Sequence, residues 1–379
     1  MGGSRTAHVP TTETAACLAA ASPLASCCRC AEACPTGAVT VSSFGPSALG
    51  AACVGCGRCA AACPTEAIAV PGFELSRLPA RDACWIECAR VAPADRTPGS
   101  HVVPCLGGLS SASLLEVVAA TGGTVTLIDR GWCATCPAGR TASPWAEALA
   151  DVVAVAAATN PIGLTVERAP LPLRRALPLP DHLGARGAAR RSVFRRHPDT
   201  RPGTKPARVH RVEPRQSLRR AAAIARLAGR PASAMLLPGL TVSDRCAASR
   251  VCVAACPTSA LSVGADAHGT GLDLDASRCT ACGACASACP EQAITIHDRG
   301  AGTASGTIAL TRMADVSCPA CGTRFTPRSE ETLCPVCVRE REVARLGFAL
   351  MRRPTTQADA IAEHRDNTGI ETIQAQGGR

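Results

Sequence analysis

The sequence predicts a multidomain chain of mixed α+β and α/β class. It should contain two small cysteine-rich units, a small parallel α/β domain between them, and a pair of cysteine knuckles near the C-terminus. Three observations carry this prediction. The pattern C-x2-C-x2-C-x3-C-P occurs twice, at residues 53–64 and 279–290. Residues 80–167 alternate strand and helix patterns. The pattern C-x2-C-x12-C-x2-C covers residues 318–337.

Composition bounds the class of protein. The 379 residues suggest two to four domains, and 46% hydrophobic residues can build their cores. The 25 cysteines stand at ligand spacings and not in a disulfide framework, which favours a reducing compartment. The N-terminus lacks the apolar core of a signal peptide, and no segment offers about 18 uncharged apolar residues. We therefore expect a cytoplasmic protein without a transmembrane helix, with peripheral attachment to a membrane complex left open.

The two complete cysteine runs predict iron–sulfur clusters. A tight loop with gaps of two residues points three thiolates at three irons of one cubane, while the fourth Cys ligates the neighbouring cluster. Gly57 and Gly283 follow the second Cys, where the backbone crowds the cluster and needs the conformational freedom of glycine. Zinc or disulfides are the alternative, and two complete five-residue signatures argue against both.

Each complete run has a degraded partner, so the pattern is an internal repeat. Four segments end in C-P-x-x-A-[VLI]-x-[VI], and they begin at Cys34, Cys63, Cys256 and Cys289. The alternating apolar tail predicts a short strand after each cysteine loop. At residues 17–70 and 244–297 the chain resembles the two-cluster bacterial ferredoxin family, present twice. The resemblance implies a ferredoxin-like (βαβ)2 fold around two cubanes in each unit.

The family's crossed pattern implies ligand sets for the first unit. One [4Fe–4S] cluster would take Cys34, Cys53, Cys56 and Cys59. The other would take Cys27, Cys30 and Cys63, with Cys17 as a fourth ligand. Leu24 stands where the register calls for that ligand, and Cys28 is a less well placed alternative. Without a fourth thiolate, this site could hold a three-iron cluster or an iron with another ligand.

The second unit has one complete set and one degenerate set. The complete [4Fe–4S] site would take Cys256, Cys279, Cys282 and Cys285. The degenerate site would take Cys246, Cys252 and Cys289, and Ser249 stands at its remaining position. Serine oxygen is a poorer partner for iron than thiolate. This site could hold [4Fe–4S] with Ser, solvent or an outside ligand, hold [3Fe–4S], or be empty. The chain should thus carry at least two and up to four cluster sites.

Residues 80–167 predict a small parallel sheet from a βαβα pattern. Strands are expected at 101–105, 124–128 and 162–167, with helices at 111–121 and 144–159. Five cysteines should then converge at the carboxyl edge, where open α/β sheets place ligands: Cys84, Cys88, Cys105, Cys133 and Cys136. Their order is similar to that in the small iron–sulfur delta subunit of methanogen hydrogenases. A metal site such as [2Fe–2S] is expected, with free buried thiols or a Cys133–Cys136 redox disulfide as alternatives.

The basic charge belongs to one segment. Residues 168–230 hold 17 Lys and Arg against three Asp and Glu, which is a net charge of +14. Since the whole chain has a net charge of +10, the remaining residues carry −4. Residues 168–235 predict an Arg- and Pro-rich linker with one helix at 216–229. It could be a solvated linker packed on the ferredoxin unit, a docking arm for an acidic redox partner, or a nucleic-acid contact. The scarcity of interleaved aromatic residues, with Phe194 as the one Phe, Trp or Tyr in this segment, argues against nucleic acid.

The last cysteines form a closed four-thiolate pattern. Zinc ribbons and rubredoxins share this layout: Cys318, Cys321, Cys334 and Cys337. Structural zinc is favoured, because the segment has little of a rubredoxin's aromatic core.

The predicted boundaries are 1–16 for a disordered N-terminus, 17–75 and 236–300 for ferredoxin-type units, 80–167 for the α/β domain, 168–235 for the linker, 314–351 for the knuckles with a helix, and 352–379 for a mobile tail.

These patterns predict an electron-transfer protein. It should pass single electrons between redox partner proteins as a subunit or accessory of an oxidoreductase complex, of the formate dehydrogenase or hydrogenase type by analogy. No catalytic residue is predicted, since no nucleotide fingerprint, catalytic triad or paired carboxylate stands out. One alternative is a redox enzyme or sensor centred on the Cys84–Cys136 thiols and fed by the ferredoxin units. Another is a nucleic-acid-binding regulatory module.

Overall fold

The computed structural model describes residues 10–48, 52–75, 83–121, 124–141, 143–159, 163–179, 209–300, 306–325, 327 and 332–351. The chain divides into two compact units, Met1–Met313 and Ala314–Arg379, and each is described by itself. Most of the expected disordered N-terminus, the middle of the basic linker and the expected tail lie outside the described residues.

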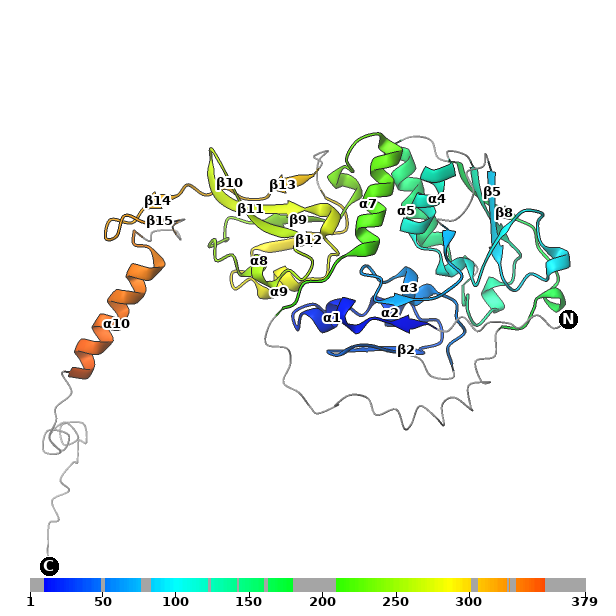
Figure 1. The fold of residues 1–379 in the computed structure, drawn as a ribbon, viewed down its shortest axis with the longest axis horizontal. Coiled ribbons are helices and arrows are strands. Elements are labelled where there is room, and N and C mark those ends of the chain that lie inside the picture. Colours follow the sequence, from blue (N-terminus) through cyan, green and yellow to red (C-terminus); the bar gives the residue numbers. More distant parts are fainter. Residues whose placement is uncertain are drawn as a thin grey trace, which may run out of the picture. The chain divides into compact units, whose positions relative to one another are not determined.

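The N-terminal cysteine-rich part has two strand–helix–strand halves (Figure 1). β1 pairs antiparallel with β4, and β2 with β3, so each half contributes one strand to each two-stranded sheet. A short helix lies beside each cysteine loop. The elements in chain order are β1 (Thr11–Thr12), α1 (Leu18–Ala21), α2 (Arg29–Glu32), β2 (Val39–Ser42), β3 (Gly45–Ala48), α3 (Arg58–Ala61) and β4 (Ile68–Ala69).

The second cysteine-rich part repeats this arrangement. β9 pairs antiparallel with β12, β10 with β11, and β13 (Thr307–Ala309) extends the latter pair. A strand follows each of the four cysteine loops, which confirms the strands predicted from the repeat. The elements in chain order are β9 (Gly239–Val242), α8 (Val251–Ala255), β10 (Leu261–Asp266), β11 (Gly269–Asp275), α9 (Ala284–Ala288) and β12 (Ile294–His297).

A four-stranded parallel sheet forms the α/β part, as predicted. The strand order is β6-β5-β7-β8, and α4 and α5 pack on the sheet. Leu114, Leu127 and Val152 are fully buried in its core. The strand β5 was not predicted. The elements in chain order are β5 (Ala83–Cys88), β6 (His101–Val103), α4 (Ser111–Thr121), β7 (Thr124–Asp129), α5 (Ala146–Ala158) and β8 (Gly163–Arg168).

Helix α7 (Arg215–Ala228) is the predicted basic helix, and it packs along α4 of the α/β part (Figure 1). Three of its four arginines, Arg215, Arg219 and Arg220, are paired with acids of other elements. Arg219 contacts Glu116 of α4 and Glu66 of the first cysteine-rich part. The helix therefore joins the parts of the larger unit and does more than cover one of them.

The smaller unit contains the knuckles. β14 (Val316–Ser317) pairs antiparallel with β15 (Arg324–Phe325), and α10 (Pro335–Met351) follows the second cysteine pair. Among the described residues, no helix is both long enough and apolar enough to cross a membrane.

Candidate metal centres

All 25 cysteines lie in the described residues, and the structure has each as a free thiol. The side chains of 23 of them gather into six groups, each named after one member, and Cys28 and Cys84 lie outside these groups. The N-terminal part holds the Cys53 site (Cys34, Cys53, Cys56 and Cys59) and the Cys17 site (Cys17, Cys27, Cys30 and Cys63). The second part holds the Cys279 site (Cys256, Cys279, Cys282 and Cys285) and the Cys246 site (Cys246, Cys252 and Cys289, with Ser249). The remaining two are the Cys88 site (Cys88, Cys105, Cys133 and Cys136) and the Cys318 site (Cys318, Cys321, Cys334 and Cys337).

The Cys53 site draws its thiols from both halves of the N-terminal part. Cys34 follows α2 of the first half, and the other three belong to the loop and helix α3 of the second. Burial and then the charges of the other thiols raise the pKa of Cys59 to about 12. The four sulfurs thus lie close enough to act on one another. At neutral pH the Cys59 thiol keeps its proton until a metal displaces it, so metal uptake at this site should release a proton.

The Cys17 site is the second four-thiol group of the N-terminal part, and Cys17 is one of its members. Cys17 is buried at the start of α1. Burial and then the charges of the other three thiols raise the pKa of Cys30 to about 12. Cys28, the alternative ligand, is exposed and donates to the Glu32 carboxylate over 2.9 Å. The arrangement therefore offers Cys17 and not Cys28 as the fourth thiol.

The four thiols of the Cys279 site line one small enclosed cavity, together with apolar side chains such as Leu240 and Ile296. Burial and then the charges of its three partners raise the pKa of Cys285 to about 12. Four soft sulfur donors around an apolar cavity are the donor set that an iron–sulfur cluster requires. This site therefore fits the expected group.

The Cys246 site keeps the loop shape of a complete site. In the intact loop, Ala281 and Gly283 adopt left-handed φ values of 51° and 82°. At the matching positions, Ala248 and Arg250 have φ values of 51° and 57°. Left-handed backbone at a residue other than glycine costs about 1–3 kcal/mol and persists only where the surroundings enforce it. Ser249 thus sits in a loop folded like a cluster loop.

Backbone N–H groups point at the sulfurs in three of the four repeats. The alanine of C-P-x-x-A donates to the sulfur of the leading cysteine, over 3.2 Å from Ala38 and Ala67 and 3.3 Å from Ala293. Such hydrogen bonds are among the factors that set the reduction potential of a cluster. The residue before each of these alanines, Gly37, Glu66 or Gln292, adopts a left-handed φ of 49–66° and so turns the next N–H back toward the cysteine.

The Cys88 site forms at the carboxyl edge of the parallel sheet, as predicted. Cys88 ends β5, Cys105 follows β6, and Cys133 and Cys136 follow β7. These four cysteines line a cavity of about 30 Å³ with Trp132. Burial, and then the charges of Asp129 and the nearby thiols, raise the pKa of Cys133 to about 12.

The predicted convergence of five cysteines at this edge is wrong for Cys84. The unpredicted strand β5 places Cys84 at its second residue, where it pairs with Val125 of β7. Cys84 lies four residues before Cys88, about 13 Å along the strand at 3.3 Å per residue. It therefore stands near the opposite edge from the other four thiols.

A buried ion pair holds the edge that carries the Cys88 site. Glu87 is fully buried beside Cys88, and Arg130 after β7 donates to it over 2.8 Å. The Thr97 N–H donates to the other carboxylate oxygen over 2.8 Å, and the Ser100 hydroxyl also donates to it. This network fixes the ends of β5 and β7, from which three of the four thiols project.

The Cys318 site is a compact group of four cysteines in the smaller unit. Its four sulfur atoms all lie within 4.8 Å of one another. The N–H of Cys334 donates to the sulfur of Cys318 over 3.4 Å, and this bond leads the effects that lower the pKa of Cys318 to about 6. A thiolate at neutral pH is the form that binds metal. The group could therefore hold a metal ion.

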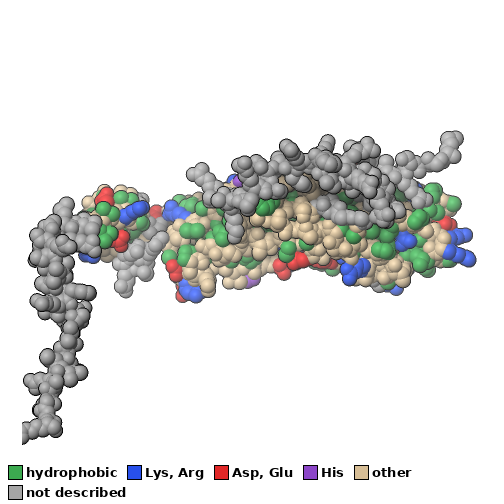
Figure 2. Space-filling model, turned by 90° about the horizontal axis from the view of Figure 1, so that it is seen from below, with side chains coloured by type: hydrophobic (Ala, Val, Ile, Leu, Met, Phe, Trp, Pro, Cys, Tyr) green, Lys and Arg blue, Asp and Glu red, His purple; other side chains and the backbone are tan. Residues whose placement is uncertain are grey.

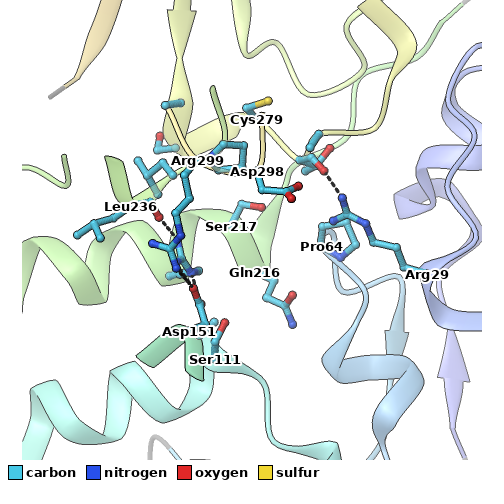
Figure 3. A pocket seen from close by; sticks show the side chains of 18 residues that line it. Arg29, Pro64, Ser111, Asp151, Gln216, Ser217, Leu236, Cys279, Asp298 and Arg299 are labelled. Carbon is cyan, nitrogen blue, oxygen red and sulfur yellow. Dashed lines mark hydrogen bonds and ion pairs between the residues drawn. The ribbon is translucent and has the colours of Figure 1, made fainter. Parts of the chain in front are cut away.

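A polar cavity of about 330 Å³ lies where three parts of the larger unit meet (Figure 3). On one wall, Asp151 of α5 accepts hydrogen bonds from Arg220 over 2.8 and 2.9 Å and from Arg299 over 3.0 Å. On another, Arg29 reaches the loop that carries Cys279. The sequence analysis missed these residues, because the partners are 69 to 251 positions apart in the chain. In Figure 2, basic and acidic side chains are interspersed over the visible face.

Comparison with known proteins finds the 4Fe-4S binding domain family. Its model matches residues 51–69 and 272–295, which contain the two complete cysteine runs. No curated protein matches the chain. The chain thus carries two ferredoxin-like iron–sulfur repeats, and these matches support a role in iron–sulfur electron transfer.

Proposed function

We propose that this protein passes single electrons between redox partner proteins, as a subunit or accessory of an oxidoreductase complex in a reducing compartment. The Cys53 and Cys279 sites carry the proposal, because each assembles four thiols from the two halves of a unit, and the 4Fe-4S family model matches one half of each unit. Both cysteine-rich parts would then be ferredoxin-like (βαβ)2 units. Each bound cluster would take up and release one electron at a time.

The Cys88 site is proposed as a further centre of this carrier, with [2Fe–2S] as the group that its four thiols would hold. One alternative, a redox enzyme centred here, would need room for a substrate. Substrate pockets typically enclose about 300–1,000 Å³, whereas this cavity measures about 30 Å³. The enclosed thiols therefore favour an electron-transfer centre over a catalytic one.

The nucleic-acid alternative is disfavoured by the ion pairs of α7. Arg219 binds Glu116 and Glu66, and Arg220 binds Asp151 within the protein. Arginines engaged in this way are not free to neutralise phosphates. The helix instead serves the assembly of the larger unit.

Reductive titration of anaerobically prepared protein tests the proposed function. Coulometry should show the uptake of at least two electrons per chain, one for each complete site. A one-electron acceptor should reoxidise the protein fully. Protein that takes up no electrons, or that discharges only to two-electron acceptors, would contradict the role of single-electron carrier.

Replacing Ser249 with Cys should complete the ligand shell of the Cys246 site. We expect wild-type protein to hold a cluster whose unique iron is weakly bound, because the loop keeps its shape while one thiolate is missing. Mild oxidation should then give the EPR signal of [3Fe–4S]. The variant should suppress this signal and lower the potential of the site, since added negative charge disfavours reduction.

The matching test in the N-terminal part is Cys17→Ala, which should produce the same three-iron signal. Cys28→Ala is the control and should leave the spectra unchanged, because Cys28 is exposed and bonded to Glu32. If wild-type protein shows only the clusters of the two complete sites and Ser249→Cys adds none, the proposal for the Cys246 site fails.

Structural zinc is the metal proposed for the Cys318 site. Cys334→Ser should release about one metal ion per chain, as expected for a single closed site, and leave the cluster spectra intact. Metal analysis with absorption spectra measures both. A red, reducible iron centre that disappears in the variant would instead identify a rubredoxin-like carrier.

A further inference from the structure

Two junctions bring cysteine sites of the larger unit close together. At the first, Cys56 of the Cys53 site packs in one buried cluster with Cys105 and Cys136 of the Cys88 site. Gly108 permits this approach, because a Cβ added there would lie 2.3 Å from the Cys56 carbonyl oxygen. Arg140, which follows the Cys136 loop, donates to the Pro35 carbonyl over 2.6 Å. The two loops are thus in direct contact.

The second junction joins the two cysteine-rich parts. Cys27 of the Cys17 site and Cys282 of the Cys279 site pack against the same buried cluster, which includes Leu18 and Ala284. The facing loops come near each other, since a Cβ on Gly283 would lie 3.9 Å from the Ser26 hydroxyl. This junction brings together Cys27 and Cys282, which are 255 residues apart in the chain.

An arginine at the same repeat position spans each junction. Arg58 stands immediately before Cys59, and its Nη1 donates to the Gly139 carbonyl of the Cys88 site over 2.8 Å. Arg29 stands immediately before Cys30, and its Nη2 donates over 2.8 Å to the carbonyl of Thr280, inside the Cys279 loop (Figure 3). In the second cysteine-rich part, Val251 and Ala284 hold this position.

From these contacts we infer that the Cys88, Cys53, Cys17 and Cys279 sites form one electron relay, and that Arg58 and Arg29 are the positioning residues of its junctions. The inference rests on the proposed electron-transfer function. Each step moves one electron from a reduced site to its oxidised neighbour, and no bond forms or breaks. The Cys246 site lies in the same part as the Cys279 site and is the last site of this relay.

The position of Arg29 explains why an arginine suits a junction. Its guanidinium reaches from one cysteine loop to a carbonyl of the next, which fixes their separation. Its positive charge also lies beside the second site, because the Thr280 carbonyl that it binds over 2.8 Å belongs to the residue next to Cys279. A cluster held by four thiolates is negatively charged when reduced, so a nearby positive charge favours the arrival of an electron.

Arg29→Gln in the full-length, anaerobically prepared protein tests the relay. In fully reduced wild-type protein, we expect spin–spin broadening of the EPR signals between the Cys17 and Cys279 sites. The variant should lose part of this broadening, and the midpoint potential of the Cys279 site should shift to a lower value. Arg29→Lys should restore the potential, because it keeps the charge. The broadening should remain weaker than in the wild type, because lysine lacks the planar guanidinium.

Arg58→Gln is the matched control at the other junction. It should alter the coupling between the Cys53 and Cys88 sites and leave the potential of the Cys279 site unchanged. The relay is overturned if Arg29→Gln retains all clusters and shows wild-type broadening and potential. It is also overturned if wild-type protein holds reducible clusters whose signals are uncoupled. If wild-type protein holds no clusters at all, the proposed function itself fails.

Discussion

Replacing Cys285 with Ala should remove one [4Fe–4S] cluster, about four irons per chain, and unfold much of the second cysteine-rich part. Cys285 is buried in a cavity whose walls are the four thiols of the Cys279 site and a few apolar side chains. Cys256, Cys279 and Cys285 belong to the buried core of this part, so the loss of the metal should destabilise it, because ligand binding and folding are coupled. Iron analysis and thermal unfolding followed by circular dichroism measure both effects.

Cys28→Ala is the control for this experiment, since it also removes one thiol but from an exposed position outside the site. It should retain the iron content and unfolding temperature of the wild type. Equal iron content in Cys285→Ala and wild-type protein would contradict the assignment of the Cys279 site.

Replacing Arg130 with Ala should lower the free energy of unfolding by about 3–5 kcal/mol, the cost of leaving a buried charge without its partner. Glu87 would lose the guanidinium that binds it over 2.8 Å, while its carboxylate stays fully buried. The ends of β5 and β7 should loosen, and the Cys88 site should lose its metal with them. Denaturant unfolding and metal analysis measure the two effects.

Arg175→Ala provides a matched comparison. Arg175 binds Asp95 over the same 2.8 Å, but its side chain is 55% exposed. An exposed ion pair contributes about 0–1 kcal/mol, so this variant should remain near the wild type in stability. If both variants lose the same small amount, the Glu87–Arg130 pair is not what holds the edge.

The grouping of the cluster thiols could be predicted because spacing within a tight loop determines which side chains converge. The gaps of two residues depend on a few neighbouring residues, and the repeat supplied four copies for comparison. The crossed fourth cysteine was implied by the resemblance to the two-cluster ferredoxin family. Leu24, the break in register, directed attention to Cys17, which the structure places near Cys27, Cys30 and Cys63. The structure then distinguishes Cys17 from Cys28 by burial, which a local pattern does not contain.

The placement of Cys84 could not be predicted from the same pattern. Residues 83–88 contain Glu87 and two cysteines, so they lack the continuous apolar run of a buried parallel strand. Without β5, the order of cysteines along the chain suggested one shared edge. Glu87 is tolerated in a buried position because Arg130 and two further donors satisfy its carboxylate.

The junctions also lie beyond local sequence patterns. Arg29 and Arg58 stand at one repeat position, and this equivalence was visible in the sequence. Their partners, the carbonyls of Thr280 and Gly139, are 251 and 81 residues away. A backbone acceptor leaves no residue signature, so only the folded chain reveals that the two arginines act at junctions.

Iron and acid-labile sulfide analysis of anaerobically prepared protein, combined with EPR of the reduced state, tests the central claim most directly. The account predicts at least eight irons per chain, about four for each complete site, with signals of [4Fe–4S] centres that disappear separately in Cys285→Ala and Cys59→Ala. Protein that binds only zinc, or that shows no reducible iron–sulfur signal, would contradict it.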